Sequence, residues 1–470
     1  MLSALLRPAA PALLLVLLAT ACDGGGGGGG GGGTTIVEPP PVQQDTLQRL
    51  LSDQELATAA DPAAPAENTE WASWVAANHA PLRSLTSTSD YQDLQFLKPL
   101  LAGRRVVQLG ESGHGVRQFS QAKVRLIRFL HQEMGYDVLA FESSLHDCWQ
   151  TNRMLGTASS RTAMNECFFR VWHTTDVLPL MDYVRESAGT ARPLTLAGFD
   201  VQPTSRGVAA RARADLLHSV LAVVDPAFAA RIQAMDADLT ALHSTNVNAF
   251  VDLLRLHTDS LAGVYGRAEE LIRQNRAAID AHFAADPQKP VVALSAAYSM
   301  RVYIRQSVLP GGDERYATRD RGMADNVDLL LDQLYPGKKV IIWAHNSHIA
   351  KGRVIPGRVN MGSLINERRG AEVYTMGLFM YTGSAADNSR TVYDIPLPHP
   401  AGSLESILYR ARRRWTFVDF STRANGPGTS WMFQDTPSRS WGVNAERYTP
   451  RDFYDGVLFI HTTTPPEYLQ

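Results

Sequence analysis

The chain has 470 residues and a formal net charge of −2, and 44% of its residues are hydrophobic. A net charge this close to zero gives no indication that nucleic acid is a partner. The part that follows the first 66 residues is long enough to bury a large core, so we expect a sizeable globular domain there.

Residues 1–21 have the features of a signal peptide. Arg7 precedes an apolar stretch that ends in small residues, and this stretch is too short to be a lasting membrane span. Two kinds of cleavage are open, because Ala19–Ala21 suits ordinary signal peptidase, while Cys22 stands where a bacterial lipoprotein is acylated. We expect Cys22 to be lipidated, so that the protein is exported and its lipid anchors it to a membrane of the bacterial cell envelope. A soluble periplasmic protein is the alternative.

Residues 22–66 predict a flexible tether. Ten consecutive glycines occupy positions 24–33, and a proline-rich stretch follows them. Glycine has no side chain with which to bury a core. A coil of this length spans roughly 35–40 Å, which would hold a globular domain clear of a membrane surface. We therefore expect the domain itself to occupy residues 67–470.

Seven apolar, β-rich runs predict the strands of an α/β domain. The early runs alternate with helical segments, which is typical of βαβ units, so we expect a largely parallel or mixed central sheet flanked by helices. From about residue 203 to 290, apolar residues recur at helical spacing without a strand run, which predicts a helical insertion that could cap a site. The predicted strands are residues 106–109, 137–143, 193–200, 339–346, 373–380, 415–420 and 456–462.

Acidic side chains and histidines stand at the ends of four of these predicted strands. They are Glu111 with His114, Glu142, Asp200, and His345 with His348. Because the carboxyl ends of parallel strands meet at one edge of a sheet, we expect these side chains to form one site. Each could instead be a hydrogen-bonded polar group of the core. Four such groups at equivalent strand ends would each need a partner, which favours a site.

Three chemistries could use these residues. Ser112 lies in a turn like the nucleophile elbow of serine hydrolases, but His114 stands where that pattern needs glycine. The pairs Glu111/His114 and His345/His348 have a spacing that zinc ligands use, although spacing alone cannot separate a ligand from a base. The third chemistry, which we favour, needs no metal or other cofactor. A histidine held by a carboxylate takes a proton from water, the hydroxide attacks a carbonyl, and a second histidine or an arginine stabilises the oxyanion.

Several remaining residues have structural interpretations. Cys148 and Cys167 could form a disulfide in an exported protein, or could stay separate, because the sequence does not give their distance. We assign the tryptophans to the core or to a pocket wall, and we leave them and three further histidines out of the site. These residues are Trp71, Trp74, Trp149, Trp172, His131, His173 and His461.

The two polar motifs resemble those of a known family. LGESGHGVRQFSQAKVRLIRFLHQEMGYDVLAFES, at 109–143, resembles the N-terminal block of the erythromycin esterase family, and IIWAHNSHIAKG, at 341–352, resembles its second block. Further similar segments lie between and beyond these two blocks, in the family's order, at 196–202, 319–327, 361–379 and 454–465. The resemblance covers roughly residues 68–465, so it assigns 67–470 to an erythromycin-esterase-like domain.

The resemblance implies an esterase that opens a macrocyclic lactone by a metal-independent attack of water. His114 then falls on the general base with Glu111 beside it. Glu142 falls on the glutamate that ends the family's second strand, and His345 and His348 fall on the two histidines of its second block, so we assign all three to catalysis. Lys123 stands where an arginine or lysine is usual in the family, and Arg319 opens a segment like its R-D-x-x-M-A pattern. We expect these two residues and Asp200, from the end of the third predicted strand, to bind substrate. Gln118 departs from the glutamate that is common in the family, and export departs from its cytoplasmic resistance enzymes.

The export signal bears on the substrate and on the function. An enzyme that protects ribosomes would meet its drug inside the cell, so we expect a small-molecule ester or lactone without assigning a macrolide. The competing interpretation is an exported lipoprotein that binds a ligand or metal in the same cleft without catalysis.

Overall fold

A computed structural model describes residues 50–59, 69–354 and 357–470. The predicted signal peptide, the lipidation site Cys22 and most of the predicted tether lie outside these residues. Within the described part, α1 (Asp53–Thr58) falls inside the range predicted as tether, so the coil prediction is wrong there. The reason is local, because Ser52 and Glu55 form a capping box at the start of α1, and Leu56 is fully buried.

The centre of the molecule is a nine-stranded mixed sheet with the order β1-β8-β11-β6-β2-β5-β3-β4, in which β7 pairs with β6. Strands β11 to β4 in this order are parallel, and β1, β7 and β8 are antiparallel to their neighbours. The predicted α/β fold with a mixed sheet is thus confirmed. The strands are β1 (Ala80–Pro81), β2 (Val106–Leu109), β3 (Tyr136–Ser144), β4 (Thr195–Asp200), β5 (Lys339–Trp343), β6 (Val373–Ala386), β7 (Val392–Asp394), β8 (Trp415–Asp419) and β11 (Gly456–Thr463), with a separate hairpin of β9 (Thr436–Ser440) and β10 (Asn444–Tyr448).

All seven predicted strands are present, because the apolar runs that predicted them are buried in the mixed sheet, whose parallel strands are covered on both faces. Successive side chains of a strand point to opposite faces. Val107 of β2 therefore packs in one core with Phe119 and Ile127, while Val106 packs in a second core with Val340. The strands that sequence reasoning missed, β1, β7, β9 and β10, are short and lie at edges or in the hairpin.

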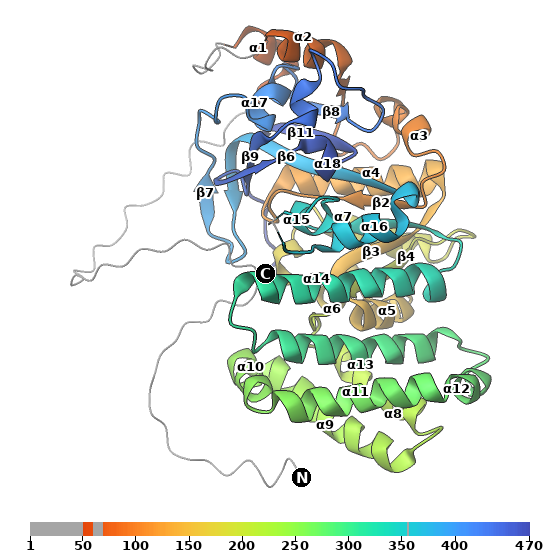
Figure 1. Ribbon diagram of the computed structural model, residues 1–470. Helices are drawn as coiled ribbons and strands as arrows, with labels where there is room; N and C mark the ends of the chain where they lie inside the picture. The colour runs from red at the N-terminus through yellow and green to blue at the C-terminus, as the bar shows by residue number, and fades with distance from the viewer. Residues whose placement is uncertain (1–49, 60–68, 355–356) are drawn as a thin grey trace.

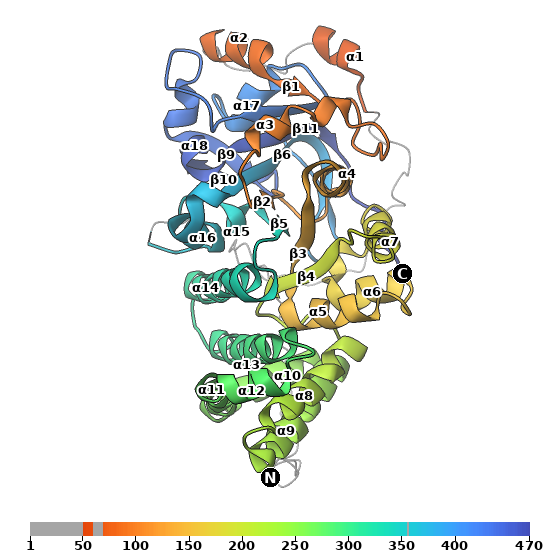
Figure 2. The same cartoon turned by 90° about the vertical axis from the view of Figure 1, so that its right-hand side faces the viewer.

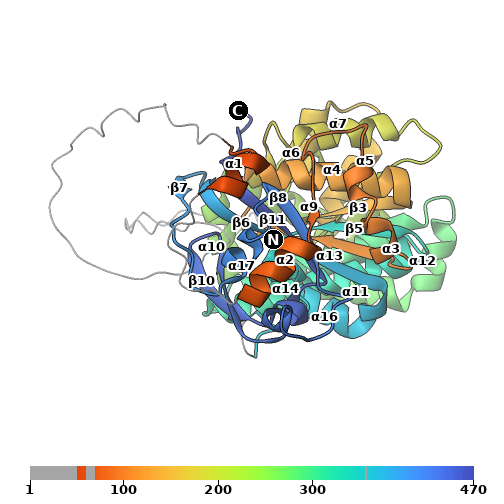
Figure 3. The same ribbon diagram turned by 90° about the horizontal axis from the view of Figure 1, so that it is seen from above.

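Helices cover both faces of the sheet. Seen from above (Figure 3), α4, α6 and α7 lie on one side of the strands, and α14 and α16 lie on the other. The remaining helices are α2 (Thr69–Asn78), α3 (Leu97–Leu100), α4 (Arg117–Met134), α5 (Leu145–Met154), α6 (Ser160–Cys167), α7 (Leu178–Ser187), α8 (Val208–Leu221), α9 (Pro226–Thr245), α10 (Val247–Leu256), α11 (Thr258–Gln274), α12 (Arg276–His282), α13 (Gln288–Gln306), α14 (Gly312–Leu329), α15 (Asn346–Ile349), α16 (Met361–Arg369), α17 (Leu404–Tyr409) and α18 (Pro450–Phe453).

The helical region between β4 and β5 forms a stack below the sheet (Figure 1; Figure 2 shows it from the side). It runs from α8 to α14, beyond the predicted end near residue 290. Pro290 does not end the region, because it lies in the first turn of α13, where no intrahelical N–H bond is lost. The added helix α14 is the element that carries Arg319 to the site.

The structure also bears on the two cysteines of the domain and on the length of its helices. Cys148 of α5 and Cys167 of α6 are joined by a disulfide, which resolves the alternative that the sequence left open. No helix in the described ranges is both long and apolar enough to cross a membrane.

Candidate active site

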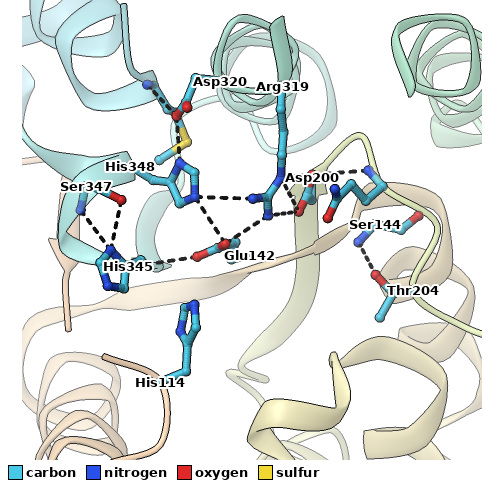
Figure 4. Close-up of polar contacts among 12 residues, drawn as sticks. His114, Glu142, Ser144, Asp200, Thr204, Arg319, Asp320, His345, Ser347 and His348 are labelled. Carbon is cyan, nitrogen blue, oxygen red and sulfur yellow. Dashed lines mark hydrogen bonds and ion pairs between the residues drawn. The ribbon is translucent and has the colours of Figure 1, made fainter. Parts of the chain in front are cut away.

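The carboxyl ends of four neighbouring strands bring the predicted polar groups to one edge of the sheet. The adjacent strands β2, β5, β3 and β4 deliver Glu111, His345, Glu142 and Asp200, respectively. Figure 4 shows Glu142 between Arg319, His345 and His348, with the His114 ring pointing towards it. The residues predicted from four separate segments therefore do lie together.

Glu111 and His114 form a buried, hydrogen-bonded pair. Glu111 is 0% exposed, and its Oε1 lies 2.7 Å from Nδ1 of His114. The indole N–H of Trp172 donates a second hydrogen bond to the same oxygen at 3.0 Å, and the other oxygen lies 2.6 Å from the ammonium of Lys123. With Nδ1–H donated to a carboxylate, Nε2 is the nitrogen of His114 that can accept a proton.

Lys123 contacts this pair through the Glu111 carboxylate. Its side chain is 0% exposed, and its ammonium lies 3.8 Å from the centre of the Trp343 ring. Burial lowers the pKa of Lys123 from 10.5 to about 8, although Glu111 opposes the shift. The sequence predicted that Lys123 binds substrate, and this is corrected here, because its ammonium contacts Glu111 and Trp343 instead of the cleft.

Aromatic rings fix the orientation of His114. Trp172 and Trp441 both meet the imidazole edge to face, with ring centroids 5.0 and 5.4 Å away. The backbone N–H of Trp441 bonds to the Ser112 carbonyl, and its φ of 57° is rare for a residue other than glycine. Gly113 permits this contact, since a Cβ there would lie 3.1 Å from the Trp441 ring. The imidazole is thus held in one position.

A second charged network surrounds Glu142. Arg319 of α14 donates to Glu142 Oε1 at 2.9 Å and also binds Asp200 through two nitrogens. Glu142 Oε2 accepts the backbone N–H of His345 at 2.9 Å. Burial alone would raise the pKa of Glu142, but the charges of His348 and Arg319, with smaller contributions from His114 and the hydrogen bond, hold it at about 2. Glu142 is therefore a carboxylate at neutral pH.

His348 and His345 are in opposite electrostatic situations. His348 Nδ1 lies 2.7 Å from Asp320 Oδ1; burial lowers the His348 pKa, but Asp320 and Glu142 outweigh it and raise the pKa above 6.5. The pKa of His345 is well below 6.5, because burial and then the charges of His114 and His348 disfavour its protonated form. His345 Nδ1 accepts the N–H of Ser347. A neutral His345 therefore carries its proton on Nε2.

A cleft of about 630 Å³ opens over this site. Its volume lies in the range of small-molecule pockets. His114, Glu142 and Arg319 line it, together with Trp172 and Tyr303. Asp200, also predicted to bind substrate, is fully buried and held by Arg319, so that prediction is corrected to a role in positioning the arginine.

The two other chemistries find less support in the geometry. Ser112 does not line the cleft, and no hydrogen bond joins its hydroxyl to a histidine within the described ranges. In the same part of the chain, no three His, Cys, Asp or Glu side chains are arranged to hold a metal ion.

Sequence reasoning missed three residues of the site. Trp172 lies in the short turn η3 (Arg170–Trp172), and Trp441 lies in the turn of the β9–β10 hairpin, so no periodicity singled either of them out. Asp320 directly follows Arg319 in a segment that the resemblance had included, and that adjacency was a usable signal. The residues that were left out, Trp172 above all, complete the surroundings of the predicted pair.

A histidine–carboxylate pair beneath a cleft, at the carboxyl ends of parallel strands, is the arrangement of an α/β protein with a candidate active site at that edge of its sheet. The family model described as erythromycin esterase matches residues 131–463. The chain belongs to the erythromycin esterase family, as its sequence motifs predicted. The matched span begins within α4, and so leaves Glu111, His114 and Lys123 outside it.

Known relatives extend the similarity over most of the chain. A candidate hydrolase of Bacillus subtilis strain 168, YbfO, is 32% identical over 429 residues, which cover 87% of this chain and 94% of that protein. Erythromycin esterase type II of Escherichia coli is 24% identical, over 67% of this chain and 78% of that enzyme. The family and these relatives support a hydrolase.

A solved structure shares the fold. It is a mutant of the erythromycin esterase EreC in an open conformation, with a TM-score of 0.63 and 18% identity. The likeness covers 83% of this chain and 99% of that one.

Proposed function

We propose that this protein hydrolyses a carboxylic ester or lactone by an attack of water that His114 activates. The observation that carries the proposal is the buried Glu111–His114 pair, in which a carboxylate holds Nδ1 at 2.7 Å while the ring lines the cleft. A base of this kind needs a fixed tautomer and a group that stabilises its protonated form. Glu111 supplies both requirements.

The reaction begins with water placed between His114 and Glu142. His114 Nε2 takes one proton, and the resulting hydroxide adds to the carbonyl carbon of the ester. Glu142 is ionised and lines the same cleft. Its Oε1 contacts both Arg319 and His348, whereas Oε2, which accepts the backbone N–H of His345, has a second acceptor position that can hold the other hydrogen of the water. The imidazolium of His114 that forms is stabilised by the negative charges of Glu111 and Glu142.

The tetrahedral intermediate that forms on addition of hydroxide needs positive charge near the former carbonyl oxygen. Arg319 lines the cleft beside His114 and Glu142, and Asp200 and Glu142 fix its guanidinium. We assign it the stabilisation of the tetrahedral oxyanion. When the intermediate collapses, the C–O bond to the leaving group breaks, and the alkoxide takes the proton from His114.

We further propose that this hydrolysis takes place outside the cytoplasm, with the protein anchored through a lipid on Cys22. The support is the apolar segment that ends at residue 21, the cysteine after it, and the Cys148–Cys167 disulfide, a bond that forms in oxidising compartments. Radioactive palmitate should label the full-length protein expressed in bacteria, and C22S should abolish the label. An unlabelled protein would contradict the anchor.

The catalytic proposal is tested with a panel of para-nitrophenyl esters and macrolide lactones. The protein and its His114→Ala variant are compared at equal concentration, with product acids identified by mass spectrometry. We expect turnover of at least one ester and a loss of roughly 10²–10⁴-fold in the variant, the range that general base catalysis contributes. A panel in which the protein never exceeds His114→Ala would refute hydrolysis, and tight binding of a panel compound without turnover would favour the binding-protein alternative.

A further inference from the structure

Four arginines besides Arg319 line the cleft that opens over His114. They come from four different segments, namely α6, η3, the connection between β4 and α8, and the connection between β6 and β7. Three of them are exposed, which places them at the mouth of the cleft, and the fourth is half-buried. They are Arg161, Arg170, Arg206 and Arg390.

These arginines lack the acidic partners that arginines usually have in this protein. Arg213 and Arg369, for example, pair with Asp236 and Asp328. By contrast, no ion pair joins any of the four mouth arginines to an acidic side chain in the part of the chain that the structure describes. Within that part, Glu142 is also the one acidic side chain that lines the cleft, and Arg319 already neutralises it.

Two of the mouth arginines are held close to each other in spite of their like charge. The guanidinium of Arg390 donates to the backbone carbonyl of Arg170 at 2.9 Å and lies 4.3 Å from the ring centre of Tyr468. Burial and then the charge of Arg170 lower the pKa of Arg390. Such an arrangement favours the binding of an anion, because an anion between the two guanidinium groups would attract both of them and offset their mutual repulsion.

Burial and positive charges around the cleft lower the pKa values of two histidines that line it, His243 and His173. Burial and, more weakly, the charges of Arg206 and Arg213 lower the pKa of His243 to about 4. Burial together with Arg390 and Arg170 lowers the pKa of His173. The protein as a whole has a formal charge of −2, so this concentration of positive charge is local to the cleft.

We propose that the mouth arginines form an anion-binding subsite, so that the ester hydrolysed at His114 carries a carboxylate, sulfate or phosphate group. The inference rests on the proposed esterase function and names its substrate class. Guanidinium groups bind such oxyanions in a two-point geometry, and a charged rim also speeds the capture of a ligand of opposite charge. The aromatic wall of Phe168, Phe169 and Tyr303 contacts the uncharged remainder of the substrate.

The test compares two chromogenic esters of similar length, the mono-para-nitrophenyl ester of glutaric acid and para-nitrophenyl hexanoate. We expect kcat/KM to be about tenfold or more higher for the anionic ester at low salt, with the preference shrinking as salt is added. Glutarate, inorganic sulfate and inorganic phosphate are then compared as competitive inhibitors, which identifies the preferred oxyanion. Equal kcat/KM values for the two esters, or a preference for the neutral one, would overturn the subsite.

Variants locate the effect. R161Q and R206Q change exposed arginines of the mouth, and R211Q changes an exposed arginine of α8 that does not line the cleft. The ratio of kcat/KM for the anionic ester to that for the neutral ester should fall about tenfold in the R161Q/R206Q double variant and stay at the wild-type value in R211Q. A double variant that keeps the wild-type ratio would overturn the assignment.

The two proposals can fail separately. If neither these two esters nor any compound of the panel above is hydrolysed, the esterase function is refuted, and calorimetric titration with glutarate alone decides on the subsite. Binding of glutarate that the R161Q/R206Q variant weakens would support the subsite, and the absence of binding would overturn it.

Discussion

Replacement of Glu111 by glutamine is the perturbation whose consequences the structure defines best. Glu111→Gln keeps the size of the side chain but removes the negative charge that faces Lys123 at 2.6 Å and His114 at 2.7 Å. Both partners are buried, so the variant leaves an ammonium group without a counter-charge in the core. Removal of one partner of a buried ion pair destabilises a protein by about 3–5 kcal/mol.

In the variant, loss of the proton from the Lys123 ammonium group removes part of this destabilisation. Its pKa in the native protein is about 8, so deprotonation costs about 1.4 kcal/mol at pH 7 and a further 1.4 kcal/mol for each pH unit below that. Weaker hydrogen bonds from Trp172 and His114 to an uncharged acceptor add about 1 kcal/mol. We therefore expect the variant to lose about 2–3 kcal/mol of unfolding free energy at pH 7, with the loss growing towards acid until it reaches the ion-pair value.

Urea unfolding at several pH values measures this loss, and a compensating variant separates stability from catalysis. Glu111→Gln/Lys123→Met has no buried unpaired charge, so most of the unfolding free energy should return. Its kcat/KM for an active ester should stay depressed by roughly 10²–10⁴-fold, because His114 still lacks the carboxylate that stabilises its protonated form. A double variant that regains wild-type activity would refute the catalytic role of Glu111, and a stability loss independent of pH would refute the reasoning about Lys123.

Three further results are expected. Trp172→Phe removes one hydrogen bond to the Glu111 carboxylate and should lower kcat/KM about tenfold with the fold intact by circular dichroism; an unchanged rate would show that the indole N–H has no role in positioning. The pKa of Glu142 is about 2 in the folded protein against 4.5 for the free group, so the ionised carboxylate stabilises the fold above pH 4.5 by at most about 3 kcal/mol, and this contribution is lost as the pH falls towards 2. Between pH 4.5 and pH 2, urea unfolding should therefore show a smaller loss of unfolding free energy in Glu142→Gln than in the native protein. Equal losses in the two proteins would contradict the ionised Glu142–Arg319 pair. Dialysis against a chelator should leave the esterase rate unchanged, since no three His, Cys, Asp or Glu side chains among the described residues are arranged to hold a metal ion. Stoichiometric zinc in protein purified without added metal, with activity that follows it, would overturn the water-and-histidine mechanism.

The sequence predicted the sheet and the polar edge well because both follow from local rules. Strands that are buried on both faces of a parallel sheet read as continuous apolar runs, and their carboxyl ends must lie together. Glu111, Glu142, Asp200 and His345 could therefore be grouped by their positions at the ends of such runs. The glycines on either side of His114 were a second local signal, because Gly113 allows the close approach of Trp441 and Gly115 that of the Ala386 backbone.

What the sequence could not give depends on contacts between distant segments. Lys123 lies on a helix among apolar neighbours, and nothing local shows that it points inward to Glu111 and Trp343 instead of into the cleft. Trp172 and Trp441 contact His114 from a short turn and from the turn of the β9–β10 hairpin, which have no periodic pattern. The arginines of the cleft mouth come from four segments that only the folded chain brings together.

The central claim, that His114 activates water, is tested most directly by comparing His114→Asn with Ser112→Ala on the same ester. Both positions are buried in one turn, so each variant is first matched to the native protein by its urea unfolding curve. We expect kcat/KM to fall by roughly 10²–10⁴-fold in His114→Asn and to stay within about threefold of the native value in Ser112→Ala. Loss of activity in Ser112→Ala with activity retained in His114→Asn would refute the role of His114 as the base.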